Sequence, residues 1–168
     1  PGRGASLLRS GAVHGRVRHS LRPAGLHLGP AFFAAQSLRA GELPLWDPYT
    51  YCGFPLYANP QVQLFYPPAW ATFALSWLLG EGSLLRLLEW QVALHVFLGG
   101  VFTYLLLSRL RAGRWAALLG ATIFQLGGFF ASQAQHLGAV SGAAWLPLVW
   151  LCVLALGEGL SWRWTVLL

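Results

Sequence analysis

Long uncharged stretches fill the C-terminal half of the chain, and their lengths predict helices that cross a membrane. No charged residue occurs from Trp90 to Ser108, and the leucines within 84–88 extend this apolar run backwards. A crossing needs roughly 20 apolar residues, so the uncharged stretch 115–157 has room for two more. The predicted crossings are 84–108, 115–133 and 143–157, with a hairpin at 134–142 and the start of another helix at 164.

Two shorter helices are predicted before these crossings. Residues 31–40 suit an amphipathic helix that ends at Gly41, because glycine readily adopts the left-handed conformation that terminates helices. A second helix opens at Pro67, since proline is tolerated in a first turn, and runs to about Leu79, where Gly80 stops it. Roughly 17 residues is the lower limit for a crossing, so we expect this shorter helix to be interfacial or re-entrant.

An uncharged, proline-rich and aromatic stretch connects the two short helices. Most of the prolines and tyrosines of the chain fall between Arg39 and Trp70, and no charged residue follows Asp47 in this stretch. We expect an ordered loop. The predicted fold class is all-α: a polytopic bundle of transmembrane helices with this loop and short interfacial helices outside it. The predicted parts are an Arg/Gly-rich arm (1–30), disordered or non-native, a loop region (31–83) and a membrane region (84–168).

Composition supports an integral membrane protein. Only 10% of the 168 residues are charged and 56% are hydrophobic, whereas about a quarter of the residues in a soluble domain are charged. The net charge of +6 is not a nucleic-acid signal, because five arginines lie before residue 23 and three more lie between apolar runs, where membrane topology explains them. We therefore expect no nucleic-acid partner. The chain begins with proline, has no methionine and ends as an apolar run begins, so we expect a piece of a longer protein.

The basic residues also predict the orientation. Arginines gather at 109–114, between the first two predicted crossings, and Arg163 follows the third. Because positively charged loops stay in the cytoplasm, the loop 39–70 and the hairpin at 134–142 are expected on the extracytoplasmic side.

Polar residues recur at helical spacing in the first predicted crossing. Gln91, His95, Gly99 and Thr103 lie four residues apart and therefore share one face. Such a stripe serves helix packing or, with Glu89, lines the mouth of a cavity.

A second polar stripe extends over the next predicted crossing and into the hairpin. It consists of Thr122, Gln125, Phe129, Ser132 and His136. Packing is again one interpretation, and the other is that both stripes converge on an outer vestibule that faces the loop.

The loop itself offers candidate binding groups. Asp47, which precedes a proline, is a turn-former or a helix cap, or a substrate contact. Asn59, Gln61 and Gln63 alternate with apolar residues, so on an extended segment their amides would line one side and bind a sugar or a polar head group. The nearby aromatic rings would stack on that ligand, or they would sit at the membrane interface as amphipathic rings do.

Beyond these groups, the chain carries no nucleotide-binding loop, zinc motif or nucleophile elbow. No spacing of metal ligands occurs either, and Cys52 and Cys152 are expected to be free.

The sequence of the loop also resembles that of a known protein family. The stretch LRAGELPLWDPYTYCGFPLYANPQVQLFYPPAW resembles the first extracytoplasmic region of the YfhO-like bacterial membrane proteins, and later residues fit the same pattern in order over about 31–157. These later residues are Leu94-His95, Tyr104, Arg109, Gly127-Gly128-Phe129, His136 and Ala144-Trp145-Leu146-Pro147.

The resemblance implies a polytopic glycosyltransferase of the GT-C class in a bacterial plasma membrane. Such an enzyme takes sugar from a polyprenyl-phosphate donor and modifies a cell-envelope acceptor, with a divalent metal as a possible cofactor. The substrate site would then be shaped by Asp47, Asn59, Gln61, His95 and His136.

The resemblance also implies an acid in the first outer loop, because an attacking hydroxyl needs a proton acceptor. Residues 1–41 contain no Asp or Glu, and Asp47 stands where the family commonly has Asn. No catalytic residue or metal ligand is therefore assigned, and we expect the chain alone to be inactive. The alternatives are a non-enzymatic transporter or envelope-assembly protein whose loop binds a lipid head group, and a purely structural membrane anchor.

Overall fold

The computed structural model describes residues 28–157, which divide into two compact units after Leu87. Most of these residues are helical, as the predicted fold class requires. The predicted arm lies outside the described residues except for its last three, and so does the helix expected to start at 164.

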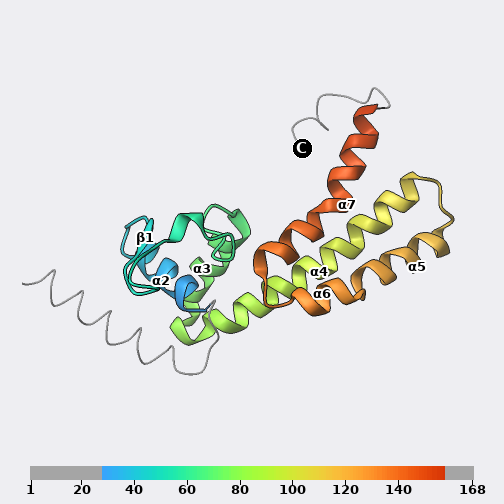
Figure 1. Ribbon diagram of the computed structural model, residues 1–168. Coiled ribbons are helices and arrows are strands. Elements are labelled where there is room, and N and C mark those ends of the chain that lie inside the picture. The colour runs from blue at the N-terminus through green and yellow to red at the C-terminus, as the bar shows by residue number, and fades with distance from the viewer. Residues whose placement is uncertain (1–27, 158–168) are drawn as a thin grey trace, which may run out of the picture. The chain divides into compact units, whose positions relative to one another are not determined.

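The first unit contains two helices and, between them, a small hairpin followed by turns (Figure 1). Its elements are α2 (Leu28–Arg39), β1 (Trp46–Asp47), β2 (Phe54–Pro55), the 3-10 turn η1 (Leu56–Ala58), α3 (Pro67–Leu79) and the 3-10 turn η2 (Glu81–Ser83).

Helix α2 ends as predicted. Gly41 has a φ of +79°, its N–H donates to the carbonyl of Leu38, and the N–H of Glu42 donates to the carbonyl of Ser37. This pair of bonds is the Schellman arrangement, which satisfies the last carbonyls of a helix. The helix begins three residues earlier than predicted, at Leu28, with Pro30 in the first turn, where a missing N–H costs nothing.

Helix α3 has the predicted bounds, Pro67–Leu79, and Gly80 follows with a φ of +96°. Two tryptophans anchor it through their indole N–H groups. Trp77 Nε1 donates to the carbonyl of Ala35 in α2 at 3.0 Å, and Trp70 Nε1 donates to the carbonyl of Leu64 at 2.6 Å. The first bond joins α3 to α2, and the second joins α3 to the loop that precedes it.

The hairpin between the helices is tight. In its antiparallel register Trp46 lies opposite Pro55, and Asp47 lies opposite Phe54. The connection turns through residues of positive φ, ending at Gly53 with a φ of +125°. A Cβ added at Gly53 would lie 2.6 Å from Cζ2 of Trp46, so the indole ring packs directly on the glycine backbone.

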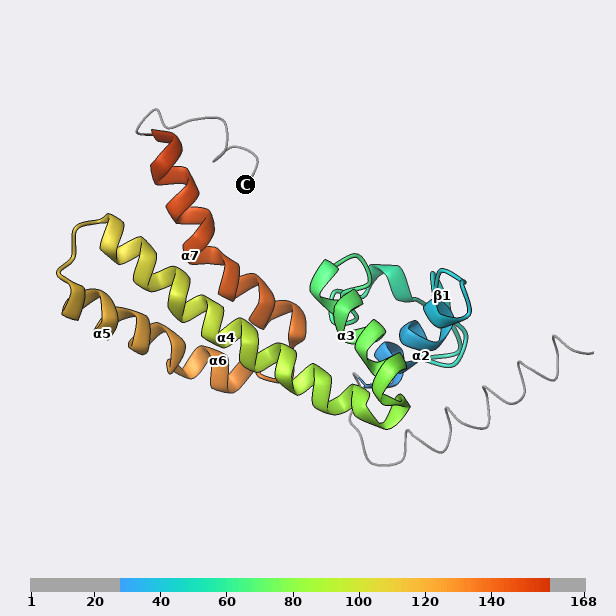
Figure 2. The same cartoon turned by 180° about the vertical axis from the view of Figure 1, so that it is seen from behind.

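The second unit consists of helices long and apolar enough to cross a membrane. The three candidate spans are Leu84–Arg109, Arg114–Gln133 and Leu137–Gly157. They correspond to α4 (Leu84–Arg109), whose first residues belong to the first unit, to α5 (Arg114–Gln125) with α6 (Gly128–Gln133), and to α7 (Leu137–Gly157). Figure 2 shows α4 and α5 side by side, joined by the short arginine-bearing turn.

The second span has the predicted bounds to within one residue. It is not one continuous helix, because Gly127 adopts an extended conformation (ψ 151°) that separates α5 from α6. Two adjacent glycines weaken a helix at this point. The third span starts at Leu137 rather than at 143, so the hairpin comprises 134–136. Gly138 and Gly142 lie within this helix, since small residues are tolerated in apolar helices that pack closely.

Close packing joins α4 to α7. A Cβ added at Gly99 would lie 3.3 Å from the Cα of Ala144, so the two backbones nearly touch there. Trp145 stacks on Phe102 with ring centroids 5.4 Å apart. Helix α7 changes direction near its middle (Figure 1), where Pro147 removes a backbone donor and bends the helix.

The contact between Gly53 and Trp46 makes a testable prediction. Gly53→Ala adds a methyl group that collides with the indole ring, at a φ that side-chain-bearing residues rarely adopt. We expect a destabilisation of about 1–3 kcal/mol, measured as faster hydrogen exchange of the hairpin amides in the purified protein. Gly82→Ala is the matched control, because nothing lies within 4 Å of a Cβ at that position. Equal exchange in both variants would contradict the packing described here.

Candidate functional site

Asp47 is buried, at 2% exposure, and its carboxylate holds a turn together. Oδ1 accepts a hydrogen bond from the backbone N–H of Tyr49 at 2.8 Å, and Oδ2 accepts one from Oγ1 of Thr50 at 2.5 Å. Both bonds are local, as in the Asx turns that aspartate commonly forms. The geometry agrees with the turn-former interpretation. A helix cap is wrong, since no helix starts there.

The amides of the loop do not alternate on an extended segment, so that prediction is wrong. The segment from Asn59 to Tyr66 is a series of turns. Asn59 Oδ1 accepts from the N–H of Gln61 at 2.9 Å, and Gln63 is buried with a φ of +55°. Asn side chains compete with regular backbone pairing by such local bonds. The predicted alternation of amides on an extended segment took no account of this competition. Asn59 and Gln61 remain partly exposed.

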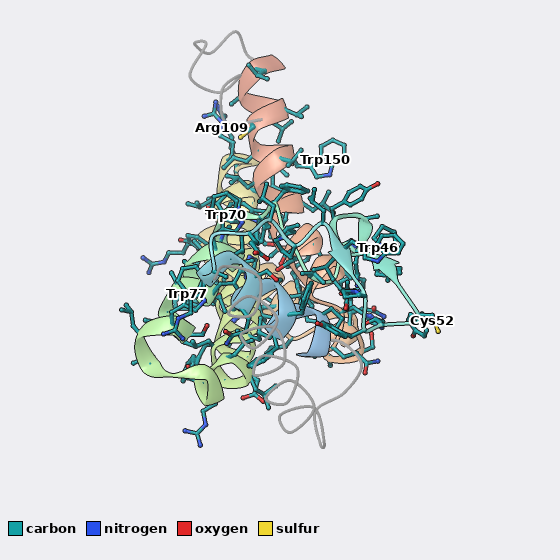
Figure 3. The ribbon with its side chains drawn as sticks, turned by 90° about the vertical axis from the view of Figure 1, so that its left-hand side faces the viewer. Trp46, Cys52, Trp70, Trp77, Arg109 and Trp150 are labelled. Atoms are coloured by element: carbon teal, nitrogen blue, oxygen red, sulfur yellow. The ribbon has the colours of Figure 1, made fainter. Side chains whose placement is uncertain are left out.

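The aromatic side chains of the hairpin and of η1 are the most accessible candidate binding groups of the first unit. Trp46 is 58% exposed, Tyr51 75% and Tyr57 56%. Figure 3 shows Trp46 and Cys52 on the same side of this unit, away from Trp70 and Trp77. Tyr49 contacts Phe33 of α2 edge to face, with centroids 5.7 Å apart, which fixes the hairpin to the helix. The three most exposed of these rings are hereafter the hairpin rings: Trp46, Tyr51 and Tyr57.

The first polar stripe shares one face of α4, as predicted, and this face is buried. His95, at 2% exposure, places Nδ1 2.7 Å from the carbonyl oxygen of Gln91. Because a carbonyl oxygen only accepts, Nδ1 donates. The ring of His95 meets Trp145 of α7 edge to face at 6.5 Å, and Thr103 Oγ1 donates to the carbonyl of Gly99. These contacts favour the packing interpretation over a cavity mouth.

The second polar stripe does not lie on one helix face. The break at Gly127 divides it between α5 and α6, so the helical spacing no longer places Thr122 and Ser132 on one continuous face. Thr122 and Ser132 donate to carbonyls of their own helices, Leu118 and Phe129. His136 stands in the hairpin, where its N–H donates to the carbonyl of Gln133 and its carbonyl accepts from Val140.

The described part of the chain does not bring metal-ligating residues together. Within residues 28–157 no three His, Cys, Asp or Glu side chains are grouped closely enough to hold a metal ion. Cys52 is free and exposed, and Cys152 is free and buried. A divalent metal therefore finds no fitting ligand set among these described residues.

Comparison of the chain with protein-family models, with curated proteins and with solved structures found no match. The resemblance to the YfhO-like proteins thus stays a prediction that rests on the residues quoted above.

The turn at Asp47 makes a second prediction. Asp47→Ala removes both acceptors, and we expect a loss of about 2 kcal/mol or more, since hydrogen bonds to charged groups contribute about 1.5–3 kcal/mol each. Asp47→Asn is the matched control, because its amide oxygen still accepts from Tyr49 and its NH2 group can donate to Thr50. Thermal unfolding in detergent and exchange of the Tyr49 amide would measure both. Equal losses of stability in the Ala and Asn variants would contradict the turn-former interpretation of Asp47.

Proposed function

We propose that this chain belongs to an integral membrane glycosyltransferase that takes sugar from a polyprenyl-phosphate donor and modifies a cell-envelope acceptor on the extracytoplasmic side. The observation that carries the proposal is an ordered unit with exposed hairpin rings placed directly before the first candidate span. Aromatic rings present flat, amphipathic surfaces, and sugar rings stack on such surfaces.

The order of the elements supports the same proposal. Two short helices flank the turn-rich loop, and three candidate spans are found from α4 onward, which is the order that the resemblance implies. In this account Asp47 shapes the loop by its turn, and His95 holds α4 against α7. Asn59 and Gln61 contribute partly exposed polar groups of the same loop. His136, in the hairpin before α7, is the remaining candidate contact.

The proton acceptor would come from another part of the protein. Both oxygens of Asp47 are engaged in local bonds, so this carboxylate is poorly placed to receive a proton from an acceptor hydroxyl. The resemblance implies an acid upstream of α2, where this chain has none, since residues 1–41 contain no Asp or Glu. Activity is therefore expected of the protein expressed from its complete reading frame.

The same engagement of Asp47 favours a second candidate function, in which the first unit binds a lipid head group without catalysis. Exposed tyrosine and tryptophan are also the residues that settle at a membrane interface. The two candidates differ in turnover: a head-group receptor binds the donor lipid but leaves the sugar on it.

The proposed orientation predicts a labelling pattern. Cys52 is free and exposed in the hairpin, so a membrane-impermeant maleimide added to intact cells is expected to label it from outside. In the Cys52→Ser background, Ala112→Cys places a thiol in the arginine-bearing turn between α4 and α5, and this thiol should react only after permeabilisation. The buried Cys152 provides the background signal. Labelling of residue 112 in intact cells would reverse the proposed topology.

The proposed activity predicts transfer of labelled sugar from a polyprenyl-phosphate donor to envelope material by the reconstituted complete protein. Loss of a stacking ring costs about 0.5–1.5 kcal/mol, so Trp46→Ala is expected to lower the transfer rate about 2- to 10-fold. Trp115→Ala is the control, because Trp115 is similarly exposed (72%) but belongs to α5. Binding of the donor lipid without release of sugar, in stably folded protein, would favour the non-enzymatic candidate.

A further inference from the structure

Helix α3 separates its side chains sharply into two faces. The buried residues Ala69, Thr72, Phe73 and Ser76 occupy one side at spacings of three and four. The opposite side, about half of the helix circumference at 100° per residue, carries exposed apolar residues. This side is hereafter the apolar face of α3: Trp70, Ala71, Ala74, Leu75, Leu78 and Leu79.

The distribution of side chains is the reverse of that in a water-soluble helix. The buried face carries small and hydroxyl-bearing residues beside one phenylalanine, whereas Leu78 and Leu79 on the apolar face are 83% and 64% exposed. No charged residue occurs anywhere in α3. A surface helix of a soluble domain places its large apolar residues toward the core and charges toward water, so this helix is built for an apolar exterior.

The buried face is already occupied by the first unit itself. Trp77, at the edge between the two faces, donates to the carbonyl of Ala35, and α2 contributes its own buried alanines to the same core. Rotation of α3 to bury its leucines would break the bond of Trp77 and that of Trp70. The apolar face therefore stays outward in the folded unit.

Chain continuity identifies the bilayer as the surroundings of this face. Only Gly80 and the turn η2 separate Leu79 from Leu84, where the first candidate span begins. These four residues, or five steps from Cα to Cα, span at most about 18 Å, so α3 lies near the start of α4. At 13 residues it is about 20 Å long and too short to cross a hydrocarbon core of about 30 Å.

We propose that α3 lies along the membrane–water interface with its apolar face inserted among the lipids. The helix then acts as an interfacial anchor that holds the first unit against the bilayer. This role does not depend on the proposed glycosyltransferase activity, and it excludes the re-entrant alternative, in which α3 would enter the membrane end on.

Spin labelling of the protein in phospholipid vesicles tests the proposal. In the Cys52→Ser background, nitroxides are attached to Ala71→Cys, Ala74→Cys and Leu78→Cys on the apolar face. Ala58→Cys, at an exposed position of η1, is the matched control. We expect collisions with molecular oxygen, which dissolves in lipid, to exceed collisions with a water-soluble nickel chelate severalfold at all three α3 positions, at similar depths. The ratio should be reversed at residue 58.

Three outcomes would overturn the proposal. Dominant collisions with the nickel chelate would place the apolar face in water. Low collision rates with both reagents would mean that protein covers it, either a second copy or other helices of the same protein. A steep increase in depth from residue 71 to residue 78 would mean that α3 enters the bilayer end on. The two alanine substitutions alter little volume, so the test stands even if Leu78→Cys disturbs folding.

Discussion

A bilayer offers no hydrogen-bond partners to a polypeptide backbone, so a segment that crosses it must satisfy its own N–H and C=O groups. This constraint accounts for the long helices of the second unit. It also governs their polar side chains, since Thr103, Thr122 and Ser132 each donate to a carbonyl of their own helix, and His95 does the same toward Gln91. Polar residues in the spans thus need not mark a water-filled site.

The first unit contains a stretch of irregular backbone between α2 and α3. Its loop closes on itself through local side-chain acceptors, Asp47 and Asn59, and through indole donors that reach distant carbonyls. The consequence is that the polar groups of the loop are largely engaged in structure, while the hairpin rings stay accessible. Recognition by this unit would therefore depend on ring surfaces more than on carboxylates or amides.

Where the conformational preference of one residue fixes the end or the start of a helix, the sequence was sufficient to predict that boundary. Gly41 and Gly80 mark helix ends because few other residues adopt positive φ without strain, and Pro67 marks a helix start. Reasoning from periodicity failed where the backbone left regular structure. The break at Gly127 divided the second stripe, and the turns after Asn59 removed the alternation of amides, because a period predicts a face only while the helix or strand continues.

The sequence by itself determined the membrane class, the number of candidate spans from α4 to α7 and the bounds of α3, since these depend on length, charge and local conformational preference. Tertiary structure decided which side chains are buried and which are exposed. It placed His95 between α4 and α7, where Gly99 permits close approach to Ala144, and it turned the large apolar residues of α3 outward. Exposure depends on which surfaces meet, and residues distant in sequence make those contacts.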